Sequence, residues 1–175
     1  EKYRFVYVPE GATAAYRSSI EFDLPVGTII AKTFSIQADL RDSDSAQDII
    51  ETRLLIHRNE GWEALPYIWN GARTDAVLSL TGGSQGVSWT DIDGEQRSTE
   101  YVVPNANQCA NCHGEVDMVP IGLKASLLNK DFPYSDGTAN QIAHWVEQGM
   151  LIGAPEDLST INTIPLEGDT SADLD

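Results

Sequence analysis

Apolar and polar residues alternate in short runs through the first hundred positions, which is typical of β-strands. In the run 49–57, Ile50 and Leu54 fall on one face, whereas Glu51 and Arg53 fall on the other. We therefore expect this strand to have one apolar face and one polar face. The same pattern predicts strands over residues 3–8, 20–24, 28–36, 49–57, 62–69, 76–80, 87–92 and 96–103.

Turns separate these runs at short intervals, which favours a β-sandwich or a β-barrel. Asp93 and Gly94 give the clearest turn, because a type I′ hairpin turn needs positive φ at its central residues. The segment 82–86 is rich in glycine and is expected to be a loop. The acidic segment 39–48 is expected to be an exposed excursion.

Helical spacing replaces the alternation after residue 104. Thr138 and Gln141 have the T-x-x-Q spacing of a capping box, and Gly149 suits the residue that follows the end of a helix. The remaining elements expected in this part are helices over 107–113 and 123–129 and a loop over 132–137.

The helix after the capping box carries Ile142, Trp145 and Val146 at i, i+3 and i+4, which predicts an apolar stripe. The whole pattern predicts an α+β protein with two domains. Residues 1–104 are expected to form a β-rich, sandwich- or barrel-like domain. Residues 105–175 are expected to form a small α-helical domain that ends in an acidic tail.

Charge narrows the possible partners of this chain of 175 residues. Asp and Glu number 27 against 11 Lys and Arg, so the formal charge is −16 and the isoelectric point is near 4.3. Such a surface repels nucleic acid and attracts basic partners. No apolar run approaches the ~20 residues that span a bilayer. Since the chain starts at Glu1 without Met, we expect a mature form whose export segment has been removed.

Both cysteines of the chain, Cys109 and Cys112, fall in a C-x-x-C-H arrangement that ends at His113. A redox dithiol and a structural zinc site are two interpretations, but zinc needs two further ligands. The third interpretation is covalent heme attachment, of which C-x-x-C-H is the signature. Two thiols on one helical turn can each add to a porphyrin vinyl group, and the following histidine can then bind the iron. The arrangement favours heme.

With this motif the chain resembles the c-type cytochromes. The segment 119–123, with Pro120 and Gly122, follows His113 where those proteins carry a turn. The resemblance implies heme c and a backbone carbonyl at or beside Pro120 that accepts the His113 ring N–H. It also implies that an apolar heme pocket is formed by Ile121, Leu123, Leu127 and Trp145.

An electron-transfer heme needs a second axial ligand. Small c-type cytochromes present a methionine from a distal segment, and this resemblance implies Met150, which follows the expected end of the helix at Gly149. Met118, His144 and an open sixth position are the alternatives. Ligation by His113 and Met150 in an apolar pocket would raise the reduction potential.

Two further resemblances concern larger parts of the chain. Segments between residues 22 and 155 resemble a group of uncharacterised exported bacterial heme proteins. Members of that group continue to a second C-x-x-C-H, so this chain is either a single-heme relative or a piece of a longer diheme protein. The β-rich half is similar, more weakly, to cytochrome P460, in which the iron is open on one side and a lysine is bonded to the porphyrin. Lys32 is the lysine to consider for that role.

The sequence therefore leads us to expect a monoheme c-type cytochrome that transfers single electrons, rather than an enzyme, and that docks a redox protein with a basic surface. The alternative is a P460-like heme enzyme or gas-binding protein with an open iron. A third hypothesis makes the β-rich half a binding module with a stacking surface of Trp62, Trp69 and Trp89. The resemblance implies the periplasm or the cell exterior, and the oligomeric state stays open.

Overall fold

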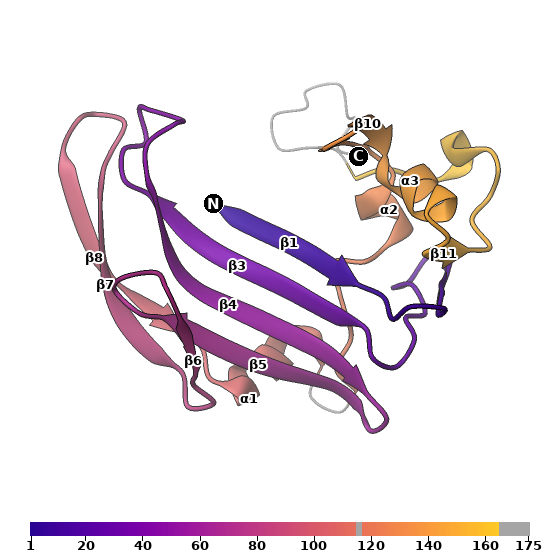
Figure 1. The fold of residues 1–175 in the computed structure, drawn as a ribbon, viewed down its shortest axis with the longest axis horizontal. Coiled ribbons are helices and arrows are strands. Elements are labelled where there is room, and N and C mark those ends of the chain that lie inside the picture. Colours follow the sequence, from indigo (N-terminus) through magenta and orange to yellow (C-terminus); the bar gives the residue numbers. More distant parts are fainter. Residues whose placement is uncertain (115–116, 165–175) are drawn as a thin grey trace, which may run out of the picture. The chain divides into compact units, whose positions relative to one another are not determined.

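The computed structural model describes residues 1–114 and 117–164, and the described chain is rich in β-structure. Its largest element is an open antiparallel sheet in the order β1-β3-β4-β5-β6 (Figure 1). Because β1 and β6 are edge strands, this sheet is not closed into a β-barrel, which was one of the two expected architectures. The strands of this sheet are β1 (Lys2–Tyr7), β3 (Ile29–Gln37), β4 (Gln47–Arg58), β5 (Gly61–Trp69) and β6 (Ala76–Leu78).

A hairpin of β7 (Gly83–Thr90) and β8 (Gln96–Val103) follows the sheet. A turn at Asp93 and Gly94 is confirmed, and Gly94 has a φ of 86°. The expected type I′ geometry is wrong, because Asp93 does not have positive φ and the Gly94 N–H donates to the Asp91 carbonyl. The predicted loop over 82–86 is wrong, because β7 begins at Gly83 and pairs there with Val103.

The register of the sheet places one cross-strand row on a single face. Arg4 on β1 lies opposite Lys32 on β3, Lys32 lies opposite Arg53 on β4, and Arg53 lies opposite Pro66 on β5. Residues directly opposite each other in antiparallel strands share a face. We call the face that carries this row the Arg53 face. Glu51 belongs to it as well, because it precedes Arg53 by two residues.

The expected division of β4 into an apolar and a polar face is wrong at Glu51. Ile50 is buried as expected, but its neighbour Glu51 is completely buried too, at the point where the register with β3 shifts. Leu55, which shares a face with Glu51, is also buried. The face that carries Glu51 and Leu55 is therefore covered, and the carboxylate of Glu51 needs partners inside the protein.

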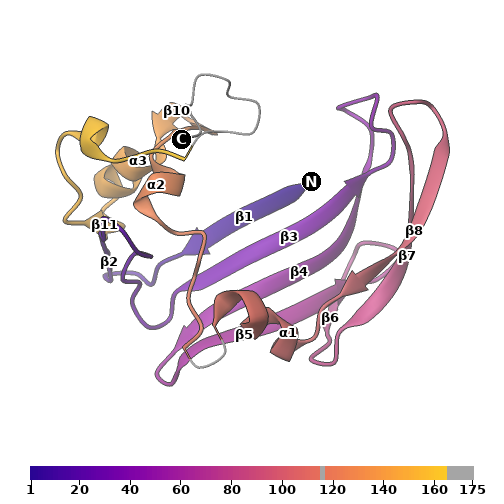
Figure 2. The ribbon, with the colours of Figure 1, turned by 180° about the vertical axis from the view of Figure 1, so that it is seen from behind.

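The described chain divides into two compact units. The first, which we call the sheet unit, comprises Glu1–Tyr7 and Val26–Val119. It contains the helix α1 (Ala106–His113), which lies against β5 (Figures 1 and 2). The division therefore falls after Val119 rather than at residue 104, and it groups the C-x-x-C-H helix with the sheet.

The second unit comprises Val8–Pro25 and Pro120–Asp175. Its core includes Phe22, Leu123, Ile142, Trp145 and Leu151. The elements of this unit are β2 (Ala14–Ala15), α2 (Ala125–Leu128), β9 (Asp131–Tyr134), β10 (Gly137–Asn140), α3 (Gln141–Glu147), β11 (Leu151–Ile152) and the 3₁₀ turn Leu158–Thr160.

Several local predictions fail in the second unit. The segment 20–24 makes only isolated bridges and is not a strand. The expected loop at 132–137 is wrong, because residues 132–134 belong to β9 and Gly137 begins β10, which leaves only 135–136 as the turn between the two strands. Asn140, rather than Thr138, caps α3, because its side chain accepts hydrogen bonds from the first turn of the helix. Val146 is 45% exposed, so of the expected apolar stripe only Ile142 and Trp145 are buried.

Two other predictions can be compared with the described chain. The expected end of α3 at Gly149 is confirmed, since that residue has a φ of 69° directly after the cap at Gln148. No helix within residues 1–114 and 117–164 is long and apolar enough to cross a membrane. Most of the expected acidic tail, residues 165–175, lies outside the described residues.

Candidate heme site

The helix that carries the C-x-x-C-H motif begins with a reciprocal cap. The Asn105 side chain accepts a hydrogen bond from the Gln108 backbone N–H at 2.8 Å. The Gln108 side chain in turn accepts the Asn105 backbone N–H at 2.9 Å. Such a capping box satisfies N–H groups that a helix start leaves without partners. With this cap, α1 begins at Ala106 and contains both cysteines.

Glycines hold both ends of α1 in place. Gly82 has a φ of 73°, and a Cβ there would lie 2.5 Å from the Val103 carbonyl oxygen and 2.8 Å from the Asn105 nitrogen. Gly114, after the helix, has a φ of 111°, and a Cβ there would lie 2.4 Å from the Asp117 carbonyl oxygen. Neither position accommodates a side chain without movement of the backbone.

The two cysteines differ in environment although they lie one helical turn apart. Cys109 is half-buried and Cys112 is exposed, and both thiols are free. Burial raises the pKa of the Cys109 thiol, the positive charge of Arg53 opposes that shift, and the negative charge of Glu51 adds to it. Residues three apart on a helix face the same side, so both sulfurs can reach one planar ligand.

This environment does not favour the redox-dithiol interpretation. Reactive cysteines have lowered pKa values and typically lie at helix N-termini. Cys109 is the fourth residue of α1, and its pKa is raised rather than lowered. The zinc interpretation also lacks its ligands, since the described residues contain no group of three or more His, Cys, Asp or Glu that could hold a metal. A heme iron needs fewer protein ligands, because the porphyrin supplies the others.

His113 is oriented by a backbone carbonyl. Its Nδ1 lies 2.7 Å from the carbonyl oxygen of Val119, and its own carbonyl accepts the Val119 N–H at 2.7 Å. A carbonyl oxygen can only accept, so Nδ1 is the donor, and in the neutral imidazole Nε2 then keeps its lone pair. That tautomer is the one that a metal-binding histidine needs. The residue beside Pro120 thus provides the contact that the cytochrome resemblance implies, and the donor set fits an axial heme ligand.

A polar cluster around the buried Glu51 lies beside the motif and was not predicted as part of the site. We call it the Glu51 cluster; it consists of Glu51, Arg53 and Tyr101. Glu51 accepts hydrogen bonds from Arg53 Nε at 3.0 Å and Nη2 at 2.5 Å, and from the Tyr101 hydroxyl at 2.6 Å. Burial and the Glu51 carboxylate raise the pKa of Tyr101. The spacing of Glu51 and Arg53, two residues apart on one strand, is the sequence feature that could have revealed it.

The other predicted heme contacts lie in the second unit. Leu123 and Trp145 are buried there, and Trp145 meets the Phe22 ring edge-on at 6.4 Å. Pro120 is buried and its carbonyl accepts the Leu123 N–H, whereas Ile121 is exposed. Their contact with heme stays a prediction, as does that of the half-buried Leu127.

The candidates for the sixth ligand have these surroundings within their own units. Met150 is half-buried; its N–H donates to the Trp145 carbonyl and its carbonyl accepts the Ala14 N–H. His144 stacks on Tyr134 with 3.7 Å between the ring centres. Met118 is half-buried in the sheet unit. Ligation by any of them stays a prediction.

The proposed tryptophan surface does not form as expected. Trp62 and Trp69 are an odd number of residues apart on β5, so their side chains project from opposite faces of the sheet. Trp62 stacks on His57 with 4.5 Å between the ring centres, and Trp69 Nε1 donates to Thr52 Oγ1. These side chains are therefore used within the sheet unit.

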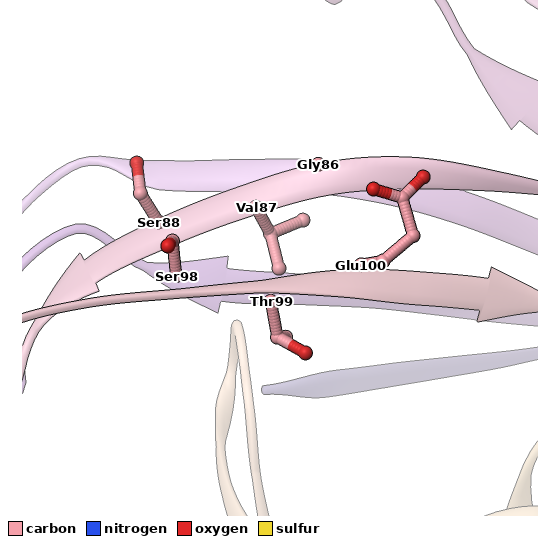
Figure 3. Close-up of a pocket in the computed structure, with 6 residues that line it drawn as sticks. All are labelled: Gly86, Val87, Ser88, Ser98, Thr99 and Glu100. Atoms are coloured by element: carbon pink, nitrogen blue, oxygen red, sulfur yellow. The ribbon is translucent and has the colours of Figure 1, made fainter.

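A shallow hollow of about 420 Å³ on the β7–β8 hairpin does not contribute to the site. In Figure 3 its lining residues project from both sides of the two-stranded ribbon, with Glu100 and Ser88 on one side and Thr99 on the other. Glu100 is the one ionisable group among them. The arrangement brings no set of catalytic or ligating groups together.

Comparison with known proteins adds no further identification. No family model matches the chain, and neither a curated protein nor a solved structure matches it.

Proposed function

We propose that the protein is a c-type heme protein that transfers single electrons through a heme bound covalently at Cys109 and Cys112. The hydrogen bond between His113 Nδ1 and the Val119 carbonyl supports this proposal most directly. This hydrogen bond leaves Nε2 available as an axial ligand. His113 directly follows Cys112 on α1, and both cysteine thiols of that helix are free. A heme bound in this way supplies an iron that changes between the ferric and ferrous states.

The protein residues would act as rigid supports. The capping box at Asn105 fixes the start of the helix, and the hydrogen bond that His113 Nδ1 donates to the Val119 carbonyl fixes the orientation of the imidazole. Little reorganisation of these groups is then required when the charge at the iron changes. Cys112 is exposed, so the thioether that it forms lies at the surface, where a redox partner can approach.

The charge of the chain supports a basic redox partner. With a formal charge of −16, the protein attracts a positively charged docking surface at long range, and this attraction weakens as salt is added. We place the protein in the periplasm or outside the cell, because covalent heme attachment in bacterial c-type systems takes place there.

Met150 is the sixth ligand in this proposal, and it can be tested against a matched residue. The chain has two methionines, so Met150→Ala and Met118→Ala remove the same group from different places. We expect Met150→Ala to abolish the far-red sulfur-to-iron band of the ferric protein and to lower its reduction potential. Met118→Ala should leave both unchanged. The band persisting in Met150→Ala would exclude Met150 as the ligand.

A second candidate function is a heme enzyme or gas-binding protein with an open iron. The observation that favours it is the Glu51 cluster, which provides buried hydrogen-bonding groups beside Cys109. Distal polar groups of this kind are one determinant of whether a heme binds gases or only transfers electrons.

An optical redox titration with and without carbon monoxide distinguishes the two functions. The electron-transfer proposal predicts one reversible one-electron step and a reduced spectrum that carbon monoxide does not change. A carbon monoxide complex that forms immediately in the wild-type protein would favour the open iron instead.

A further inference from the structure

Among the described residues, three cations on the Arg53 face make no ion pair, although the protein is strongly acidic. Four of the 11 Lys and Arg residues, Lys2, Arg4, Lys32 and Lys130, have no salt bridge within residues 1–114 and 117–164. Acidic residues outnumber basic ones 27 to 11, so carboxylates are not scarce. The seven cations that do make salt bridges are Arg17, Arg41, Arg53, Arg58, Arg73, Arg97 and Lys124.

Lys2, Arg4 and Lys32 lie together. Arg4 is directly opposite Lys32 across β1 and β3, and Lys2 is directly opposite Phe34. The Phe34 ring has Lys32 Nζ at 4.9 Å from its centre, Arg53 Cζ at 4.4 Å and Lys2 Nζ at 6.0 Å. We call Lys2, Arg4 and Lys32 the cationic row. Like charges directly opposite each other destabilise a sheet, so this placement is unfavourable unless an anion lies among them.

Glu51 does not supply that anion. Its carboxylate is already bound by Arg53 and Tyr101. The cationic row and Arg53 together carry four positive charges. The Glu51 carboxylate carries one negative charge, so the local charge is +3. Burial lowers the pKa of Lys32, and the charges of Arg4, Lys2 and Arg53 lower it further, while Glu51 opposes the shift. A bound anion would relieve this repulsion.

The position of the row relative to the heme motif indicates which anion it takes. Helix α1 lies against β5, and the Cys109 thiol is within electrostatic reach of Arg53 and Glu51. From Pro66 on β5 the cross-strand row runs through Arg53 and Lys32 to Arg4, away from the helix, in steps of ~4.8 Å. Along it the side chains change from half-buried at Arg53 and Lys32 to exposed at Arg4.

We propose that Lys32, together with Arg4 and Lys2, binds the propionate carboxylates of the heme that Cys109 and Cys112 attach. This inference rests on the proposed function. A porphyrin carries its vinyl groups and its propionates on opposite edges, so attachment at α1 directs the carboxylates away from the helix. Charge-assisted hydrogen bonds from Lys and Arg to carboxylates are short and strong, and they hold the carboxylate ionised.

The test measures the propionate pKa in the heme-loaded protein by ¹³C NMR, with the carboxyl carbons labelled through a heme precursor. Lys32→Gln should raise the pKa of at least one propionate by about one unit or more. Arg4→Gln, at an exposed position that tolerates substitution, should shift the same carboxyl in the same direction by a smaller amount. Arg58→Gln is the control, because Arg58 lies on the same strand as Arg53 but five residues further on, so its side chain projects from the opposite face of the sheet. It should shift neither propionate.

The outcomes separate this inference from the proposed function. Heme attached in all variants, with the same propionate pKa in Lys32→Gln, Arg4→Gln and Arg58→Gln, would overturn the cationic row as the propionate site. Inorganic phosphate that binds at Lys32 in the heme-loaded wild type would overturn it as well, because the cations would then be free for a soluble anion. A wild-type protein without covalent heme would refute the proposed function, and the inference would fall with it.

Discussion

Substitution of Glu51 by Gln keeps the shape of the side chain and removes only its charge, yet it should clearly lower the stability of the sheet unit. The side chain of Glu51 is 0% exposed and that of Arg53 is 30% exposed, so the substitution removes one charge of a largely buried pair. Breaking a fully buried pair costs about 3–5 kcal/mol, whereas an exposed pair contributes about 0–1 kcal/mol. Because water still reaches part of Arg53, we expect a loss of about 2–3 kcal/mol.

A matched control lies on the same two strands. Arg58 on β4 and Glu63 on β5 form a pair at 2.9 Å, but their side chains are 52% and 48% exposed. Glu63→Gln should therefore cost at most about 1 kcal/mol. Urea unfolding followed by circular dichroism and by tryptophan fluorescence measures both variants. Equal losses of stability in the two variants would refute the claim that burial makes the Glu51 pair important.

Three smaller predictions concern the supports of the site and the acidic loop. Gly82→Ala should lower the unfolding free energy by more than about 1 kcal/mol, because the added Cβ would press on the Val103–Asn105 backbone. Gly71→Ala is the control, because nothing lies within 4 Å of its added Cβ, and thermal denaturation compares the two variants. Asn105→Ala should cost about 1 kcal/mol through loss of the capping box, and urea unfolding that shows no loss would contradict the role of the cap. The Arg41 guanidinium holds the pKa of Asp39 at about 2 rather than 3.8, so its stabilising contribution is present above pH 3.8 and is lost as the pH falls toward 2. Carboxyl ¹³C NMR should show that pKa returning toward 3.8 in Arg41→Gln, and an unchanged pKa would contradict the assignment of the shift to Arg41.

Local features of the sequence predicted those parts of the fold that depend on neighbouring residues. The strand β8 coincides with the predicted strand 96–103, because alternation and the Asp93–Gly94 turn define it together. The helix of the motif was predicted within one residue, since its cap and its cysteines lie in one short segment. The sequence around Pro133 and Gly137 predicts a loop, whereas the structure has the β9–β10 hairpin there.

Contacts between distant segments could not be predicted in this way. Alternation alone places Glu51 on a polar face, whereas in the structure it is buried and bound by Tyr101, 50 residues later. The grouping of α1 with the sheet depends on contacts between β5 and the motif helix, which no local pattern encodes. The cationic row likewise exists only through the register of β1, β3 and β4.

Mass spectrometry of the peptide that contains Cys109, Cys112 and His113 tests the central proposal most directly. The protein should be produced in a host with a working cytochrome c maturation system and then digested. We expect this peptide to be heavier by the mass of one heme and to carry the visible absorption. A peptide of unmodified mass, with its two thiols free or joined to each other, would contradict the account.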